Sequence, residues 1–200
     1  MNQQDFTVQL LRNAYADKGY EFFENGDFNL NIFGVRNSTR ESGRFDDFIG
    51  VAYKDKGQWI VRAWKATTDA GTHWLVRPMN KKGTALLVPE QYRKCWKLGL
   101  HKGEYEALVQ QKPMKVYRDN DKDRILDLDA STIDEGLFGI NCHRSNPRFE
   151  SQEVDRWSAG CQVFMAPIAY ANFMALVKKS ASIYGDEFTY TLFDQVDFSL

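Results

Sequence analysis

Short alternating apolar segments, separated by turn residues, run through most of this chain and constrain its fold more than any other feature. The segments 48–53 and 59–64 flank Lys56-Gly57, an arrangement typical of a β-hairpin. Eight further segments alternate in the same way or form short apolar runs between Gly, Asn, Asp and Pro turn signals. These strand candidates are residues 28–32, 73–76, 84–88, 106–109, 114–117, 137–142, 162–165 and 188–193.

Two other segments have the period of a helix. Apolar residues recur at helical spacing over residues 5–18, and Gly19 is placed to end that helix. Nearer the other end, Pro167 stands where the first helical turn tolerates proline, and apolar residues then follow one face to Tyr184. Many short strands with a helix near each end predict a β-rich α+β fold.

From these elements we expect a single domain over residues 1–200, because this length is ordinary for one domain. Its core is expected to be a mixed β-sheet, sandwich or barrel-like, with an N-terminal helix and one helix after the strand at 162–165. Residues 1–36 would form an N-terminal extension of helix and strand, and residues 45–200 the β-rich core that carries any catalytic site.

The balance of charges excludes some classes of partner. The chain holds 26 Lys and Arg against 27 Asp and Glu, whereas a general nucleic-acid binder needs a basic excess, so no nucleic-acid partner is expected. No apolar run approaches the roughly 20 residues that cross a bilayer, so we expect no membrane span. The first residues, Met-Asn-Gln-Gln-Asp-Phe, lack the basic and apolar regions of a secretory signal, which predicts synthesis in the cytoplasm.

The sequence offers little for a metal ion. The run 119–124 begins like a calcium loop, but Arg124 stands where a glycine is needed and Ala130 where a bidentate glutamate is needed. Cys142 and His143 are adjacent, so in a strand they would point to opposite faces, and there is no Cys-x-x-Cys or His-Glu-x-x-His. We therefore expect no metal and no cofactor.

A cysteine and a histidine stand at the ends of two apolar strands. The three cysteines, Cys95, Cys142 and Cys161, are an odd number, so at least one thiol is expected to be free. One strand delivers His143 at its end, and after a polar loop the turn 158–160 presents Cys161 at the start of the next. A nearby imidazole activates a thiol, which predicts a cysteine nucleophile. Cysteine is also a common core residue, and the spacing alone leaves both interpretations open.

This spacing resembles a known signature. His143, fourteen residues and then Ser158-Ala159-Gly160-Cys161 resemble the active-site motif of the L,D-transpeptidases, the YkuD-like family. That motif is a His, a gap of 14 to 17 residues, Ser or Thr, His-Gly-Cys, a hydrophobic residue and Arg or Asn. The resemblance covers residues 137–163. It departs from the family at Ala159, where a second His is expected, and at Gln162 and Val163, where the hydrophobic residue and Arg or Asn are expected.

The resemblance implies roles for the matching residues. Cys161 would be the nucleophile and His143 its base, while Ser158 and Gly160 would shape the turn and the oxyanion site. The family acts on peptidoglycan stem peptides: its cysteine attacks a peptide carbonyl, and an amine or water resolves the acyl-enzyme.

The departures from the motif and the missing signal segment favour a divergent, hydrolytic member. Such a protein would be a lysin or antibacterial effector that acts in the periplasm or at the cell wall, reached through an export or delivery partner. A segment trimmed of its signal would look the same.

Four neighbours are candidates for substrate binding. Arg144 could bind a substrate carboxylate, or be an exposed loop arginine. Trp157 could wall the cleft, or belong to the core. Asn141 could orient the catalytic imidazole, and His101 could line the cleft or lie at the surface.

A second interpretation is a binding module. The aromatic content of 14% would suit a non-catalytic cell-wall or peptide-binding β-domain that keeps a relic of the Cys/His site. The tryptophans that suggest this are Trp59, Trp64, Trp74 and Trp96. Thiol reactivity separates the two interpretations, because only a catalytic Cys161 is expected to alkylate faster than the other cysteines.

Overall fold

A closed barrel of eight strands forms the centre of the computed structural model, which describes residues 2–198. The strands follow the order β1-β11-β5-β6-β9-β10-β3-β2 around the wall. Their bounds are β1 (Asn31–Arg36), β2 (Asp47–Asp55), β3 (Gln58–Thr67), β5 (Gln91–His101), β6 (Tyr105–Gln110), β9 (Cys142–Arg144), β10 (Gln162–Phe164) and β11 (Glu187–Asp194). The pairs β1–β11 and β9–β10 are parallel, so the barrel is mixed.

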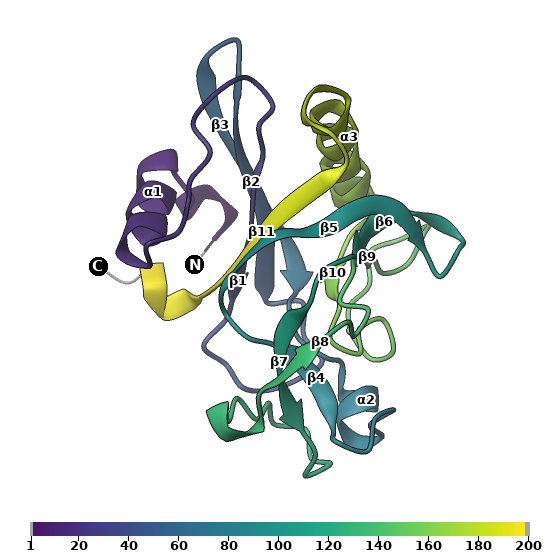
Figure 1. Ribbon diagram of the computed structural model, residues 1–200. Helices are drawn as coiled ribbons and strands as arrows, with labels where there is room; N and C mark the ends of the chain where they lie inside the picture. Colours follow the sequence, from purple (N-terminus) through teal and green to yellow (C-terminus); the bar gives the residue numbers. More distant parts are fainter. Residues whose placement is uncertain (1, 199–200) are drawn as a thin grey trace.

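A smaller sheet lies at one end of the barrel (Figure 1). It has the order β4-β7-β8, with bounds β4 (Thr84–Leu87), β7 (Met114–Asp119) and β8 (Asp134–Gly136). The helices are α1 (Val8–Asp17), α2 (Thr72–Val76) and α3 (Pro167–Tyr184), with short 3-10 turns at Gln3–Asp5, Ala130–Thr132 and Gln195–Phe198. The architecture confirms the expected β-rich α+β fold with its N-terminal helix and its helix after β10. Within the described residues, no helix combines the length and hydrophobicity that crossing a bilayer requires.

Two apolar clusters lie on either side of the barrel wall. The interior is filled around Trp96, whose ring stacks on Tyr190 with centroids 4.3 Å apart and whose indole N–H donates to the Ile140 carbonyl at 2.7 Å. The other cluster joins α1 to the outer face through Leu11 and Phe33, both fully buried. Burying side chains of this size contributes about 2 kcal/mol each to the free energy of unfolding. Since β1 carries Phe33 between β11 and β2, the expected N-terminal extension contributes a strand to the barrel itself.

The strand expected at residues 73–76 is wrong, because these residues form helix α2. Gly71 caps its start, and its carbonyl accepts hydrogen bonds from the N–H groups of Trp74 and Leu75 at 3.0 and 3.3 Å. Only Leu75 of this helix is buried. A run of five residues with one buried side chain carries too little periodicity to separate a helical turn from a strand.

The single strand expected at residues 137–142 is also wrong. Strand β8 ends at Gly136, β9 begins at Cys142, and the chain between them is irregular. Gly139 takes a positive φ of 74°, which breaks the extended conformation. The N–H groups of Phe138 and Ile140 donate to the Gln110 side-chain oxygen at 3.0 and 2.9 Å instead of to a neighbouring strand.

Strand β5, the longest in the barrel, was not among the strands expected from the sequence. Its alternation is interrupted at Lys94, which has a φ of 51°, and the register with β11 shifts close by, between Phe188 and Tyr190. As a result the consecutive residues Cys95 and Trp96 are both buried. A bulge of this kind hides the period of two that identifies a strand.

Candidate active site

The parallel pair β9–β10 assigns its side chains to two sides of the barrel wall. Cys142 pairs with Gln162, and His143 pairs with Val163. Because side chains alternate along a strand, Cys142 and Gln162 point inward, where both are fully buried. His143 and Val163 point outward, and Cys161, two residues before Val163, lies on the same outer face. The structure therefore brings the expected nucleophile and base to one face of one strand pair.

Ser158 holds the turn that presents the cysteine. Its side chain is fully buried, and its Oγ donates to the Cys161 carbonyl at 2.8 Å and accepts from the Gly160 N–H at 3.2 Å. Its carbonyl accepts from the Gly71 N–H at 2.9 Å. With these contacts Ser158 ties the turn to the start of α2 and has no role as a nucleophile.

Gly160 is required by the shape of this turn. Its φ of +119° lies in the region that favours glycine. A Cβ at this position would lie 2.5 Å from the Ala85 carbonyl oxygen and 3.2 Å from Cδ1 of Ile140. The turn is therefore pressed against strand β4, which fixes where Cys161 emerges.

Cys161 is a neutral thiol at rest. Its Sγ–H donates to the Gly139 carbonyl at 3.3 Å, and its side chain is partly exposed. Burial raises the pKa of the thiol, while a hydrogen bond with the Asn141 backbone and, to a smaller extent, the positive charge of Lys102 act in the opposite direction. Within residues 2–198 the Cys161 N–H has no hydrogen-bond acceptor, so it is available to an oxyanion next to the sulfur.

His143 is held as a neutral base with a defined tautomer. Its ring is 3% exposed, and Nδ1 lies 2.7 Å from the Arg144 carbonyl oxygen, which accepts the Nδ1 proton. Nε2 therefore carries the lone pair. Burial, together with the neighbouring His101, lowers the pKa of His143 to about 3. The candidate site thus holds a neutral imidazole, and among the described residues no hydrogen bond joins it to Cys161, whose thiol donates to Gly139.

The hairpin between β5 and β6 supports this imidazole. His101 pairs with Tyr105 across the turn, and its ring stacks on His143 with centroids 4.0 Å apart. The Tyr105 hydroxyl lies 3.3 Å from both Nδ1 of His143 and the Arg144 carbonyl. Burial raises the pKa of Tyr105 to about 12, so it remains a donor. Only 7% of His101 is exposed, which excludes the alternative that it is a surface residue.

The other expected substrate-binding residues take different positions. Asn141 accepts from the Gln110 N–H at 2.8 Å and its amide nitrogen lies 3.2 Å from Nδ1 of His101, so it orients His101 and not His143. The Arg144 guanidinium lies 4.0 Å from the ring centroid of Tyr105, which places it at the site. The side chain of Trp157 is 40% exposed, and it is not among the residues that line the cavity beside the turn.

That cavity, of about 310 Å³, continues from the cysteine turn toward the small sheet. Its lining includes Ala159 of the turn, Phe138 and Leu137 from the irregular segment, and Trp74 of α2. The Arg118 guanidinium lies 4.5 Å from the Phe138 ring and gives the wall a positive group. The cavity thus has a mixed polar and apolar lining beside the turn, and its cation, Arg118, is ion-paired with Asp134 at 3.1 Å.

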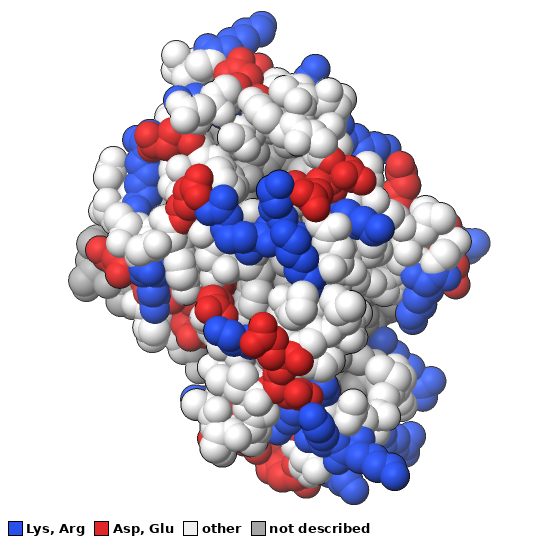
Figure 2. Space-filling view, in the orientation of Figure 1, with Lys and Arg blue, Asp and Glu red and all other residues white. Residues whose placement is uncertain are grey.

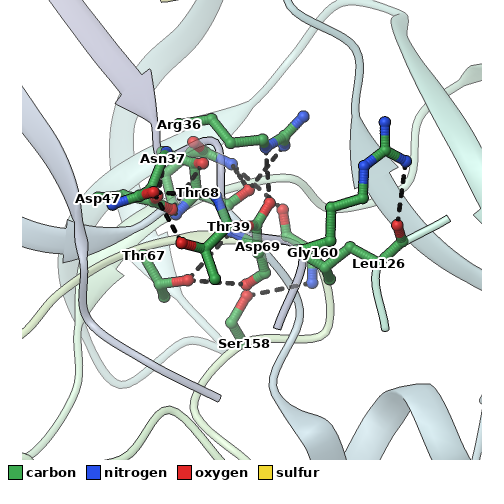
Figure 3. Close-up of polar contacts among 12 residues, drawn as sticks. Arg36, Asn37, Thr39, Asp47, Thr67, Thr68, Asp69, Leu126, Ser158 and Gly160 are labelled. Carbon is green, nitrogen blue, oxygen red and sulfur yellow. Dashed lines mark hydrogen bonds and ion pairs between the residues drawn. The ribbon is translucent and has the colours of Figure 1, made fainter. Parts of the chain in front are cut away.

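A buried polar network lies behind the turn (Figure 3). Arg36, 1% exposed, forms an ion pair with Asp69 at 2.6 Å without hydrogen-bond alignment, and its Nη2 donates to the Thr68 carbonyl at 3.2 Å. The side-chain amide of Gln162 donates to the same carbonyl and to that of Gly160, both at 3.3 Å. The network therefore connects the barrel interior to the backbone of the cysteine turn.

Asp47 completes this network from β2. Its carboxylate accepts from the N–H groups of Asn37 and Thr68, both at 2.7 Å. Burial, together with the charge of Asp69, raises the pKa of Asp47 to about 8. The carboxylates of Asp69, Asp47 and Asp194 all act electrostatically on the buried guanidinium of Arg36.

Charges on the surface are mixed. Figure 2 shows Lys and Arg interspersed with Asp and Glu over the visible face, which agrees with the net charge of −1. Comparison with family models, with characterised proteins and with solved structures finds no match to this chain. The functional argument therefore rests on the site itself.

Sequence reasoning missed two residues of the site, Tyr105 and Lys102. Both belong to the β5–β6 hairpin, whose turn carries positive φ values at Lys102 and Gly103. A Lys-Gly pair of this kind also joins β2 to β3, where it was recognised. The same turn signal at 102–103 could have placed His101 opposite Tyr105.

Proposed function

We propose that this protein is a cysteine-dependent, L,D-transpeptidase-like enzyme that acts on peptidoglycan stem peptides, by hydrolysis rather than by cross-linking. The observation that carries the proposal is that His143 and Cys161 lie on the same outer face, with the Nδ1 proton of His143 bound by the Arg144 carbonyl and its Nε2 unprotonated. The spacing of His143 and the Ser-x-Gly-Cys turn supplies the family resemblance.

The chemistry follows from this geometry. Nε2 of His143 takes the thiol proton as Sγ of Cys161 attacks a peptide carbonyl carbon, and the Cys161 N–H faces the oxyanion that forms. The tetrahedral intermediate collapses, the peptide C–N bond breaks, and the imidazolium returns its proton to the leaving amine. Water, deprotonated by the same imidazole, then attacks the thioester and releases the acid and the free thiol.

The surroundings of the site suit a stem peptide. Such peptides carry free carboxylates, and two cations are candidates to bind them: Lys102, whose charge acts on Cys161, and Arg144, which lies over the ring of Tyr105. The cavity from Ala159 to Trp74 offers room for the flanking residues of the peptide.

Two substitutions relative to the family motif favour hydrolysis: Ala159 stands in place of the second His, and Val163 in place of Arg or Asn. Val163 packs against Phe45 and Val154, and Ala159 has only a methyl group at the cavity wall. Neither side chain can hold an acceptor amine in place by hydrogen bonds. Water needs no such positioning residue, so it is the favoured acceptor.

The decisive experiment incubates purified muropeptides with the wild type, Cys161→Ala and Cys142→Ala, followed by mass analysis. Loss of a terminal residue or cleavage of a cross-link with the wild type and Cys142→Ala, and no change with Cys161→Ala, is the expected result. Exchange of the terminal D-amino acid would show transpeptidation instead. Unchanged muropeptides with a folded wild type would overturn the proposal.

A binding module remains the competing proposal, and the tryptophans argue against it. Trp96 is fully buried, Trp64 packs against Phe164, and Trp59 packs against Phe22. Of these four residues, only Trp74 lines the cavity. They do not combine into one aromatic surface of the kind that binds sugars or peptides.

A further inference from the structure

The loop that follows β7 gathers carboxylates into one cluster. Asp119 is the last residue of β7, and Asp121 and Asp127 come from the loop. One carboxylate oxygen from each of the three lies within 4.8 Å of the other two. Two oxygens bound to the same Ca²⁺ ion at about 2.4 Å are at most about 4.8 Å apart, so the spacing suits a shared ion.

Asp119 is the observation that points to a ligand. Its side chain is 0% exposed, and Oδ2 accepts from the Asp127 N–H at 3.0 Å. The other oxygen, Oδ1, is buried and has no hydrogen-bond partner within residues 2–198. A buried carboxylate oxygen without a partner is costly, and in native proteins such groups are generally paired or bound to a metal.

No ion pair neutralises the cluster among the described residues, although Arg40 acts on Asp127 from the neighbouring segment. In the part of the chain that the structure describes, no Lys or Arg forms an ion pair with Asp119, Asp121 or Asp127. A bound cation would relieve both the repulsion and the unpaired oxygen.

We propose that Asp119, Asp121 and Asp127 bind one Ca²⁺ ion. The donors are all carboxylate oxygens, which hard divalent cations prefer, and Asp123 adds a further carboxylate to the same loop. Ca²⁺ accepts irregular arrangements of oxygens, whereas Mg²⁺ demands a near-ideal octahedron.

The objection from the sequence was that Arg124 replaces the glycine of a calcium loop. In the structure it is Lys122 that adopts the left-handed conformation in this loop, with a φ of 67°. The loop is therefore not a helix–loop–helix calcium site, yet its backbone still returns Asp127 to Asp119.

An ion here would fasten the loop to the rest of the fold. Between the ligands, Leu126 is buried and exchanges hydrogen bonds with Arg40: its N–H donates at 2.8 Å, and its carbonyl accepts from Nη1 of Arg40 at 3.4 Å. Figure 3 shows Leu126 near the Arg36 network that supports the cysteine turn. The ion would thus stabilise the side of the molecule next to the candidate active site.

The test titrates CaCl₂ into chelator-treated full-length chain by isothermal calorimetry, with thermal unfolding in parallel. We expect one saturable site and a Tm that rises with Ca²⁺ concentration. Asp121→Asn, at an exposed position, and Asp127→Asn should each weaken binding at least tenfold. Glu135→Gln removes the same charge on the neighbouring strand β8 and should bind like the wild type. Circular dichroism verifies that each variant is folded.

Three results would overturn the proposal. The first is a folded wild type with neither binding heat nor a Tm shift. The second is wild-type affinity in both Asp121→Asn and Asp127→Asn. The third is Mg²⁺ binding as tight as Ca²⁺ binding, which would reject calcium as the ion. None of these readouts depends on Cys161 or on the proposed reaction.

Discussion

Cys142 begins β9 and Cys161 directly precedes the adjacent strand β10, but the two side chains lie on opposite sides of the barrel wall. Cys142 is fully buried among apolar side chains, and burial raises its pKa well above the ordinary value. Cys161 is partly exposed, and the charge of Lys102 works against the effect of burial on its pKa. A shift of one residue in side-chain alternation therefore separates an inert thiol from a candidate nucleophile.

The two histidines of the site allow the largest test of this comparison. His143→Ala removes the proposed base and should lower muropeptide turnover about 10²- to 10⁴-fold, the usual range for a general base. His101→Ala removes only the stacked neighbour and should cost about tenfold or less. Steady-state kinetics on both variants measure the difference. Equal losses in two folded variants would show that neither imidazole is the base.

Alkylation rates test the two sides of the wall directly. At pH 8, Cys161 should react with iodoacetamide about a hundredfold faster than Cys95 or Cys142, because only its side chain is partly exposed. Peptide mapping by mass spectrometry gives the three rates. Since His143 is neutral, the Cys161 rate should rise with pH, without a reactive thiolate at pH 5 to 6. Equal rates in the folded protein would contradict the assignment, and unfolding in urea serves as the control that equalises them.

Gly139 and Gly160 both have a positive φ and lie in the segments around the thiol. Their alanine variants distinguish the cost of backbone strain from the cost of a steric clash. Gly160→Ala should lower the free energy of unfolding by about 2–4 kcal/mol for two reasons. The new Cβ would clash with the Ala85 carbonyl, and alanine would have to adopt an unfavourable φ. Gly139→Ala has the unfavourable φ but nothing within 4 Å of the new Cβ, so about 1 kcal/mol is expected. Urea denaturation measures both. A smaller loss for Gly160→Ala than for Gly139→Ala would show that the turn is not pressed against β4.

The smallest effect concerns the inner side of the wall, at Asp47. Its folded pKa of about 8 lies above the unfolded value near 4, so the native state keeps a proton that the unfolded chain releases. Its contribution is therefore complete below pH ~4 and is lost as the pH rises through 8, with about 1 kcal/mol lost between pH 7 and 8. Asp47→Asn should flatten that decline in urea denaturation. An unchanged slope would mean that Asp47 is ionised in the native state.

The sequence predicted the elements of the fold that depend on local patterns of residues. Alternation identified the β2–β3 hairpin, and helical spacing with Pro167 identified α3 with its observed bounds. The His143–Cys161 spacing predicts that the two residues share a site, which stays a prediction; the register of β9 with β10 puts Val163, two residues after Cys161, beside His143. These features depend on short stretches of chain, which is why they are visible without a structure.

The remainder depended on contacts between distant segments. The bulge at Lys94 hid strand β5, and with it the hairpin that brings His101 and Tyr105 to His143. Asn141 was expected to orient the catalytic imidazole, but its partner His101 lies forty residues away in the sequence. Tertiary pairing of this kind leaves no local period to detect.

The closure of the barrel has a consequence for how the protein is made. Strand β1 pairs with β11, so that Ile32 lies beside Tyr190, and the wall stays open until β11 has been synthesised. Before that moment β1 presents an unpaired edge, and such edges favour aggregation of partly folded chains. Pairing at such a large sequence separation also slows folding. The strands that carry the candidate site, β5, β6, β9 and β10, are consecutive in the wall, and β5 pairs directly with β11. All four are synthesised before β11, which then joins the site strands to β1 and closes the barrel.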